Sequence, residues 1–172
     1  YRLGELFGVP VHETPVGFKY IGPIMSQENA LMGGEESGGF GFRGHIPERD
    51  GILSGLFLLD MMVKTGKRPS ELIEYLYSRV GPHHYRRDDV SFEPEHRGAV
   101  ERRMRQARPD ALGGTRVVRQ DRVDGTRFIL EDGSWAIVRF SGTEPLLRIY
   151  AEGESPDRVD ILISEARSLA GV

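Results

Sequence analysis

The stretch from Arg139 to Arg148 constrains the fold more than any other part of the sequence. Apolar, β-prone residues precede it at 135–138, and alternating residues follow it at 147–151, so both flanks are predicted to be strands. The turn between them contains two hydroxyl residues, a glycine and a proline, and an arginine lies at each end. The sequence therefore predicts two adjacent strands whose connecting turn gathers polar and cationic groups.

This turn has two interpretations. Backbone amides in a concave turn, hydroxyl donors and guanidinium forks are the groups that bind phosphate oxygens, and a glycine lets the backbone approach a ligand closely. The alternative is an ordinary hairpin turn with arginines on a solvated face. The turn alone leaves both interpretations open.

Composition excludes several classes of protein. The 172 residues suit one domain or two small ones, and 38% hydrophobic with 28% charged residues is typical of a globular protein with a core. A net charge of −3 provides no basic field for nucleic acid. No apolar run is long enough to span a membrane, and the lack of cysteine fits an intracellular, cytoplasmic protein. Because the chain begins at Tyr1 with neither a methionine nor a leader, we expect a piece of a longer protein.

The first 82 residues are predicted to form an α/β partial domain, a mixed sheet with helices. Helices are expected at residues 1–8, in a short segment reaching 25–27, and at 52–64 and 69–80; strands are expected at 9–14, 30–32 and, irregularly, 40–42. Apolar residues cover most of the circumference of the helix at 52–64, so we expect this helix to be well buried.

Residues 81–84 are the best candidate for a linker, and the pattern changes after them. Strands are predicted at 85–92, 115–120, 126–130, 134–140 and 147–152, and helices at 94–107 and 156–169. Two Asp-Gly pairs mark hairpins. Residues 85–172 are therefore predicted to form an α+β domain with a largely antiparallel sheet and two helices.

A second informative stretch is the glycine loop from Gly34 to Gly39. Short polar side chains after a buried strand suit a hydroxyl-rich ligand, because a carboxylate accepts hydrogen bonds from two adjacent sugar hydroxyls and a serine adds another. A solvated loop without a ligand is the alternative interpretation of this stretch taken alone.

Together, the two stretches resemble the α-D-phosphohexomutase superfamily of phosphoglucomutases and phosphomannomutases. Three segments carry the resemblance: Thr14–Lys19, Gly34–Gly39 continuing to His45–Gly51, and Arg139–Pro145 with Arg148. Their order and spacing match the family over essentially the whole chain. The resemblance implies the later part of the third domain, residues 1–82, followed by the fourth domain, residues 85–172.

The resemblance assigns site residues by position. It implies that Glu35 and Ser37 hold sugar hydroxyls and that Gly17 and Lys19 lie in a loop that approaches the substrate. Arg49 stands where some relatives place a substrate-facing lysine, so it departs from the pattern. The implied phosphate-binding residues are Arg139, Ser141, Gly142, Thr143 and Arg148. His45 is either a helix-start or packing residue or a proton-transfer group, and no catalytic residue is assigned within the chain.

The resemblance also implies a chemistry. In the family, a phosphoserine donates its phosphoryl group to a hexose phosphate, and a hexose 1,6-bisphosphate intermediate turns over before the other phosphate returns to the serine. The phosphoserine loop and the loop that binds Mg²⁺ have no match in these residues, so we expect the chain alone to be inactive. We also expect self-association through the truncated domain edge.

Two other classes remain open at this stage. The chain is alternatively a free-standing sugar-phosphate binding module without catalysis, or a structural fragment whose ligand loops are disordered in isolation. The sequence does not choose between glucose and mannose, and the residues at 36–39 rank acetamido-sugar mutases lower.

Overall fold

The computed structural model describes residues 1–142 and 146–172, so Thr143, one of the predicted phosphate-binding residues, lies outside the described residues. The chain divides into two compact units, Tyr1–Val80 and Gly81–Val172. The first is an α/β part and the second an antiparallel sheet with helices, which confirms the predicted fold class. No helix within the described residues is long and apolar enough to cross a bilayer.

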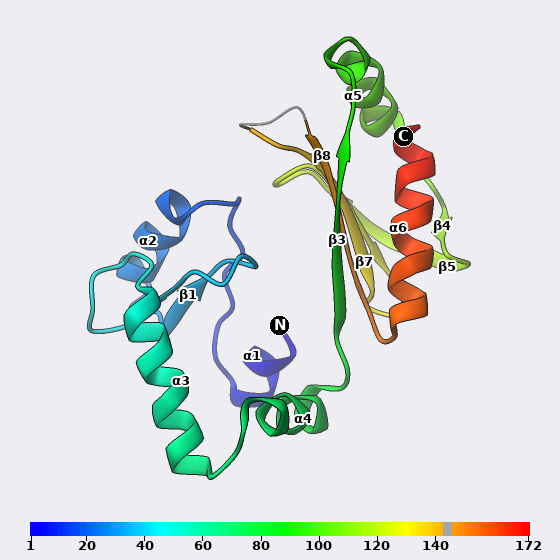
Figure 1. Cartoon of the computed structure of the whole chain (residues 1–172). Helices are drawn as coiled ribbons and strands as arrows, with labels where there is room; N and C mark the ends of the chain where they lie inside the picture. Colours follow the sequence, from blue (N-terminus) through cyan, green and yellow to red (C-terminus); the bar gives the residue numbers. More distant parts are fainter. Residues whose placement is uncertain (143–145) are drawn as a thin grey trace. The chain divides into compact units, whose positions relative to one another are not determined.

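The N-terminal unit consists of four helices and a two-stranded sheet (Figure 1). The sheet has only two strands, β1 and β2, and they are antiparallel. It is therefore narrower than the expected sheet, and its pairing is antiparallel rather than mixed. The helices α2 and α3 contact β1 and β2 respectively. In chain order the elements are α1 (Arg2–Phe7), α2 (Phe18–Gln27), β1 (Met32–Gly34), β2 (Phe40–Phe42), α3 (Gly51–Thr65) and α4 (Pro69–Val80).

Two sequence predictions for strands in this unit need correction. Residues 9–14 adopt no regular structure, because no neighbouring strand pairs with them and Val9 and Val11 remain exposed. The strand predicted at 30–32 instead covers Met32–Gly34, so it lies further along the chain than the hydrophobicity indicated and includes the first residues of the glycine loop.

The prediction that the apolar helix α3 is well buried is wrong for this chain. None of its residues is buried, and Ile52 and Val63 are 82% and 75% exposed. The helix itself is well specified, since Asp50 caps its first turn and Gly66 ends it in the left-handed conformation. The physical reason for the exposure is that the unit has only one thin sheet, which leaves the other faces of the helix uncovered.

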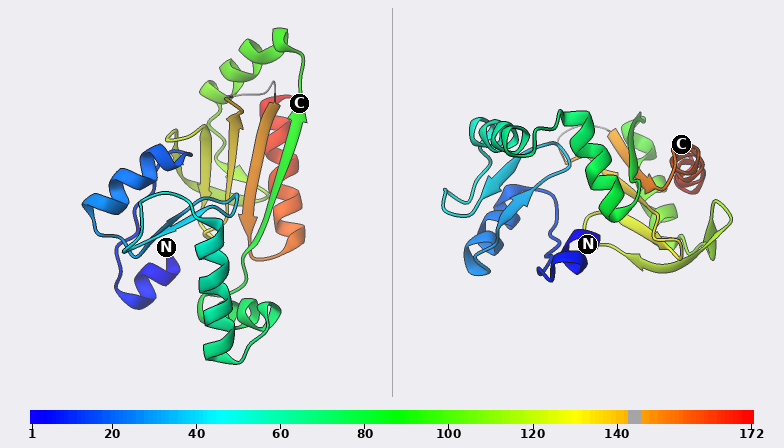
Figure 2. Two further views of the ribbon diagram at one scale, coloured as in Figure 1. Left: turned by 60° about the vertical axis from the view of Figure 1, so that its left-hand side comes forward. Right: turned by 90° about the horizontal axis from the view of Figure 1, so that it is seen from below.

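The C-terminal unit is built on a six-stranded antiparallel sheet with the order β3-β8-β7-β6-β5-β4 (Figures 1 and 2). The two-residue strand β4 was not predicted, because two residues carry no readable alternation. The elements are β3 (His84–Ser91), η1 (Pro94–His96), α5 (Arg97–Gln106), β4 (Ala111–Leu112), β5 (Thr115–Asp121), β6 (Thr126–Leu130), β7 (Trp135–Phe140), β8 (Leu146–Gly153) and α6 (Pro156–Ala170).

One face of this sheet packs against α6 and forms the core. Strand side chains alternate, so Phe128, Val138 and Ile149 point toward Leu162 and Ile163 of α6 while their neighbours point to the opposite face. The helix α5 packs on α6 through Val100 and Met104. The arginines of β7 and β8 alternate with these core residues, and they therefore lie on the face away from α6.

The turn at Gly113–Gly114 and the start of α6 are joined by Arg158. Its guanidinium donates to the Gly113 carbonyl at 2.7 Å and to the Ser134 hydroxyl at 3.2 Å, and it lies 3.0 Å from Asp132. Burial raises the pKa of Asp132, but the hydrogen bonds from Ser134 and the charge of Arg158 outweigh it, so the net pKa is lowered. The network fixes two turns of the sheet to the helix.

Replacing Leu162 with alanine should destabilise the C-terminal unit. Leu162 is fully buried against the sheet, so Leu162→Ala should lower the free energy of unfolding by about 2–5 kcal/mol through lost burial and a residual cavity. Its neighbour Ile161 is 47% exposed, so Ile161→Ala should cost no more than about 0.5 kcal/mol. Urea denaturation of both variants measures the difference, and equal costs would contradict the packing described.

Candidate functional site

The predicted phosphate-binding turn lies at the junction of β7 and β8. Residue 139 pairs with residue 148 across the two strands, so the two arginines stand directly opposite each other. The amide of Ser141 donates to the Leu146 carbonyl at 2.8 Å and closes the base of the turn. Ser141 is buried and Gly142 is exposed, and a Cβ at Gly142 would meet no other atom among the residues described. The pairing of β7 with β8 therefore brings the two arginines and the described part of the turn, Ser141 and Gly142, to the same end of the two strands.

Arg139 is held by Asp124, on the side away from Arg148, and by Tyr150 of β8. Its Nη1 donates to Asp124 Oδ2 at 2.8 Å, and the guanidinium lies 5.5 Å from the centre of the Tyr150 ring. Only 13% of the side chain is exposed. The ion pair and the aromatic contact together fix this guanidinium at the end of the strand.

Arg148 has an acidic neighbour on its other side. Residue 148 pairs with Asp89 of the edge strand β3, and its Nε lies 3.9 Å from Asp89 Oδ1. Across the sheet the order of side chains is therefore Asp89, Arg148, Arg139 and Asp124. Like charges opposite each other in a sheet are destabilising. Asp124, at 2.8 Å from Arg139, offsets this repulsion directly, whereas Asp89 is shared with Arg87, which lies closer to it at 3.2 Å. The adjacent arginines form a cationic pair suited to an anion.

The glycine loop connects β1 to β2 through a tight turn. The Glu35 amide donates to the Gly39 carbonyl and the Gly38 amide donates to the Glu35 carbonyl, both at 3.0 Å. Gly38 has a φ of 89°, a conformation that favours glycine. Ser37 is exposed at the tip of this turn. The loop is an ordered hairpin turn that presents short polar side chains.

Glu35 and Arg49 are brought together by this turn. Arg49 Nη1 lies 3.2 Å from Glu35 Oε2, and only 10% of the Glu35 side chain is exposed against 54% for Arg49. The aliphatic part of Arg49 passes so close to Gly39 that a Cβ there would be 2.5 Å from its Cδ. The exposed guanidinium and the sheltered carboxylate thus offer donors and acceptors side by side, as recognition of sugar hydroxyls requires.

The predicted residues Gly17 and Lys19 adjoin this pair through Phe18. Gly17 precedes α2 with a φ of 122°, and Lys19 Nζ lies 4.8 Å from the Tyr20 ring centre. The buried Phe18 ring lies 5.6 Å from the Arg49 guanidinium. The start of α2 therefore lies next to Arg49 through Phe18, and the Lys19 ammonium group lies over the Tyr20 ring.

His45 lies in the loop that precedes α3. Its Nε2 is 3.0 Å from Asp50 Oδ2, and the other oxygen of Asp50 accepts the Leu53 amide at 2.9 Å. The hydrogen bond from Leu53 is the main cause that lowers the pKa of Asp50, and His45 adds to it. His45 therefore contacts the residue that caps α3.

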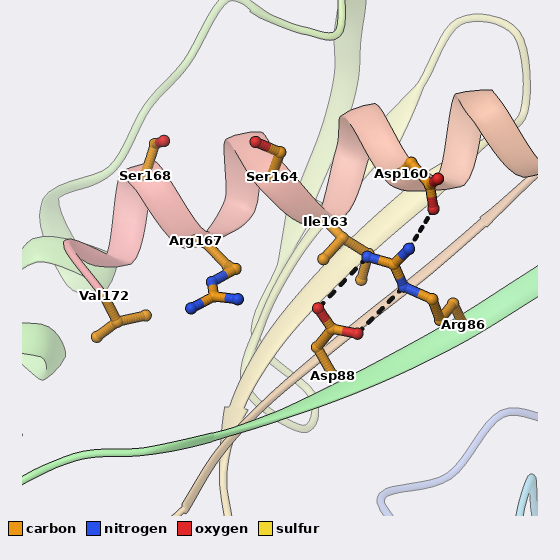
Figure 3. A pocket seen from close by; sticks show the side chains of 8 residues that line it. All are labelled: Arg86, Asp88, Asp160, Ile163, Ser164, Arg167, Ser168 and Val172. Carbon is orange, nitrogen blue, oxygen red and sulfur yellow. Dashed lines mark hydrogen bonds and ion pairs between the residues drawn. The ribbon is translucent and has the colours of Figure 1, made fainter.

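A shallow pocket lies elsewhere, between β3 and α6 (Figure 3). Arg86 stands between Asp88 and Asp160, and it forms ion pairs with both. Figure 3 shows Arg167 of α6 pointing into the same pocket. Because two carboxylates already neutralise Arg86, this cluster serves to join the edge strand to the helix.

The sequence interpretation missed the acidic partners of the arginines. In the sequence, Asp124 belongs to one of the Asp-Gly pairs that predict hairpin turns, and Asp89 lies within the strand predicted at 85–92. The alternation of β3 and the position of the Asp-Gly turn were readable, but the strand order that brings both beside the arginines was not. Within the described residues, no group of three or more His, Cys, Asp or Glu side chains could hold a metal ion.

Comparison with known families gives matches to both units. Residues 1–80 match the model for phosphoglucomutase/phosphomannomutase alpha/beta/alpha domain III, and residues 95–168 match that for the C-terminal domain. The chain therefore belongs to the phosphoglucomutase/phosphomannomutase family, and it corresponds to the third and fourth domains.

Individual relatives agree with this assignment. A phosphoglucomutase/phosphomannomutase of Thermococcus kodakarensis is 32% identical over 88% of this chain and 31% of its own length. A phosphoglucosamine mutase of Rubrobacter xylanophilus is 31% identical over 89% and 31%. The solved structure of a protein from Thermus thermophilus, named a putative phosphomannomutase, has 36% identity and a TM-score of 0.78, over 99% of this chain and 33% of its own. The chain spans about a third of the length of these relatives.

The environment of Asp50 predicts a pH dependence. Because its folded-state pKa is lowered from 3.8, the stability contributed by the ionised carboxylate is present above pH 3.8 and is lost as the pH falls through the lower, folded value. The Leu53 amide resonance, followed by NMR from neutral to strongly acidic pH, should titrate with a midpoint below 3.8. Asp50→Asn should abolish this titration and Asp60→Asn, on the same helix, should preserve it. A midpoint above the ordinary aspartate pKa would contradict the capping geometry.

Proposed function

We propose that this chain is the substrate-binding part of a phosphohexomutase that interconverts hexose 1-phosphate and hexose 6-phosphate through a bisphosphorylated intermediate. The observation that carries the proposal is the pair Arg139 and Arg148, opposite each other at the mouth of the Ser141–Gly142 turn. The family assignment supports the sugar-phosphate chemistry. The chemical step belongs to a phosphoserine and an Mg²⁺ site that no segment of these residues resembles.

The roles of the chain are binding and orientation. Phosphoryl transfer depends mainly on position and electrostatics, so a clamp on the phosphate that is not reacting lowers the barrier by holding the sugar in place. Arg139 and Arg148 supply the guanidinium forks, and Ser141 and Gly142 supply the described part of the turn. Thr143 keeps the phosphate-binding role that the family resemblance implies. Glu35, Ser37 and Arg49 bind sugar hydroxyls, with Gly17 and Lys19 beside them. Because hydroxyls lie between the two phosphate positions, one such loop serves both orientations of the sugar.

Hexose phosphates are the first choice of substrate, and glucosamine phosphate is a second candidate. Relatives at nearly equal identity carry the names of phosphoglucomutase/phosphomannomutase and of phosphoglucosamine mutase. An amino group in place of a hydroxyl donates to a carboxylate as well, so Glu35 suits both sugars. Binding of glucose 1-phosphate, mannose 1-phosphate and glucosamine 1-phosphate in parallel separates them.

Inorganic phosphate should bind the chain weakly through the arginine pair. Each well-formed hydrogen bond to a charged group contributes about 1.5–3 kcal/mol, and exposure to water reduces the total to a roughly millimolar dissociation constant. NMR titration should shift the amides of Ser141 and Gly142. Arg148→Ala should abolish these shifts, and Arg148→Lys should restore them only in part, because an ammonium lacks the planar fork.

A matched control is Arg116→Ala. Arg116 lies on the same sheet in an exposed ion pair with Glu131, so its loss removes the same charge away from the turn. Binding that Arg116→Ala and Arg148→Ala weaken equally would mean general attraction by charge and would remove the phosphate assignment.

The chain by itself should not interconvert glucose 1-phosphate and glucose 6-phosphate. It offers binding groups, while the donor phosphoserine of the family has no counterpart in its sequence. A coupled assay on the purified chain should give no rate above buffer. Turnover by the chain alone that Glu35→Ala abolishes would overturn the proposal that the chain only binds and orients the substrate. If the complete natural protein binds the sugar phosphate without turnover, the alternative of a sugar-phosphate binding module is favoured.

A further inference from the structure

The turn between β5 and β6 lies directly against the strand that carries Arg139. Gly125 in this turn has a φ of 102°, and a Cβ on it would be 2.5 Å from the Val138 carbonyl oxygen and 3.0 Å from the Arg139 Cβ. Only glycine fits such an approach without a shift of the backbone. The close contact places the preceding residue, Asp124, beside the Arg139 guanidinium.

Asp124 accepts a hydrogen bond from one terminal nitrogen of that guanidinium. The distance from Arg139 Nη1 to the carboxylate is 2.8 Å, and the Tyr150 ring lies near the guanidinium. The Nε of Arg139 is buried and makes no hydrogen bond to any of the residues that the structure describes. A buried donor without a partner is costly, and an anion beside Arg139 would satisfy it.

The Arg158–Asp132 pair elsewhere on the sheet shows what distinguishes Arg139. Arg158 also has an Nε that makes no hydrogen bond within the described part of the chain, but its terminal nitrogens are shared among a carboxylate, a carbonyl and a hydroxyl. Arg139 instead has a second cation, Arg148, directly opposite it in the sheet. The side of Arg139 away from Asp124 therefore faces a second cation.

We propose that Asp124 is a positioning and charge-balancing residue of the phosphate clamp, an inference that rests on the proposed function. Because Asp124 holds the Arg139 guanidinium through Nη1, the Nε of Arg139 is left to donate to the phosphate. The negative charge of Asp124 also reduces the attraction between the arginine pair and the phosphate. A clamp of this kind grips in one orientation yet releases its ligand, which a reaction that exchanges the two phosphate positions needs.

The test is a phosphate titration of the full chain, read from the Arg139 Nε–Hε resonance and the Ser141 and Gly142 amides. Asp124→Asn keeps an acceptor for Nη1 but removes the charge, so it should tighten phosphate binding about threefold or more at low salt. The gain should shrink in about 0.5 M NaCl, because salt screens the added attraction. Asp124→Ala removes the anchor as well, so the Arg139 Nε–Hε resonance should move toward that of a free arginine and affinity should fall below that of Asp124→Asn.

Asp132→Asn is the matched control, since it makes the same change of charge in the other Asp-Gly turn of the sheet. It should leave phosphate affinity within about twofold, because screening weakens a distant charge. Equal tightening by Asp132→Asn and Asp124→Asn would overturn the inference.

The outcomes separate the two proposals. In one outcome, Arg148→Ala abolishes phosphate binding, but both Asp124 variants keep an affinity within about twofold of that of the unaltered chain. This outcome would overturn the role of Asp124 and leave the phosphate clamp in place. Absence of phosphate binding in the unaltered chain and in Asp124→Asn would overturn the clamp and the role of Asp124 together. The isosteric Asp124→Asn change keeps the comparison valid even if Asp124→Ala disturbs the turn.

Discussion

The antiparallel pairing of β7 with β8 places two arginines opposite each other, and the candidate phosphate site depends on this register. Adjacent like charges cost free energy in a sheet, so the arrangement persists only with compensation. Asp124 in a hairpin turn provides it directly, whereas Asp89 in the edge strand is shared between Arg148 and Arg87. A shift of one residue between the strands would turn one arginine toward the α6 core and separate the pair.

The two units differ in how their structure is stabilised. All of the largest fully buried side chains among the described residues belong to the C-terminal unit, where a sheet and α6 enclose them. The N-terminal unit buries few side chains and exposes the apolar helix α3. Its order depends more on local devices, namely the Asp50 cap, the Gly38 turn and the Glu35–Arg49 ion pair. The phosphate clamp therefore has the firmer support of the two sites.

The sequence predicted much of this fold because alternation and helical periodicity are strong between residues 85 and 172. It failed where tertiary context decides: residues 9–14 lack a partner strand, and α3 lacks a covering layer. The candidate residues came from short motifs, which identify Arg139 and Glu35 but not what holds them. Asp124 and Asp89 reach Arg139 and Arg148 only through strand order, and the Arg49–Phe18 contact only through packing, so no local pattern could reveal them.

The most direct test of the account is the map of residues that respond to glucose 1-phosphate. NMR of the labelled chain should show shifts at Glu35–Ser37 and at Ser141–Gly142 with this ligand, at Ser141–Gly142 alone with inorganic phosphate, and at neither with glucose at the same concentration. Shifts confined to the pocket between β3 and α6, or equal shifts at both loops with inorganic phosphate alone, would contradict the assignment of separate sugar and phosphate sites.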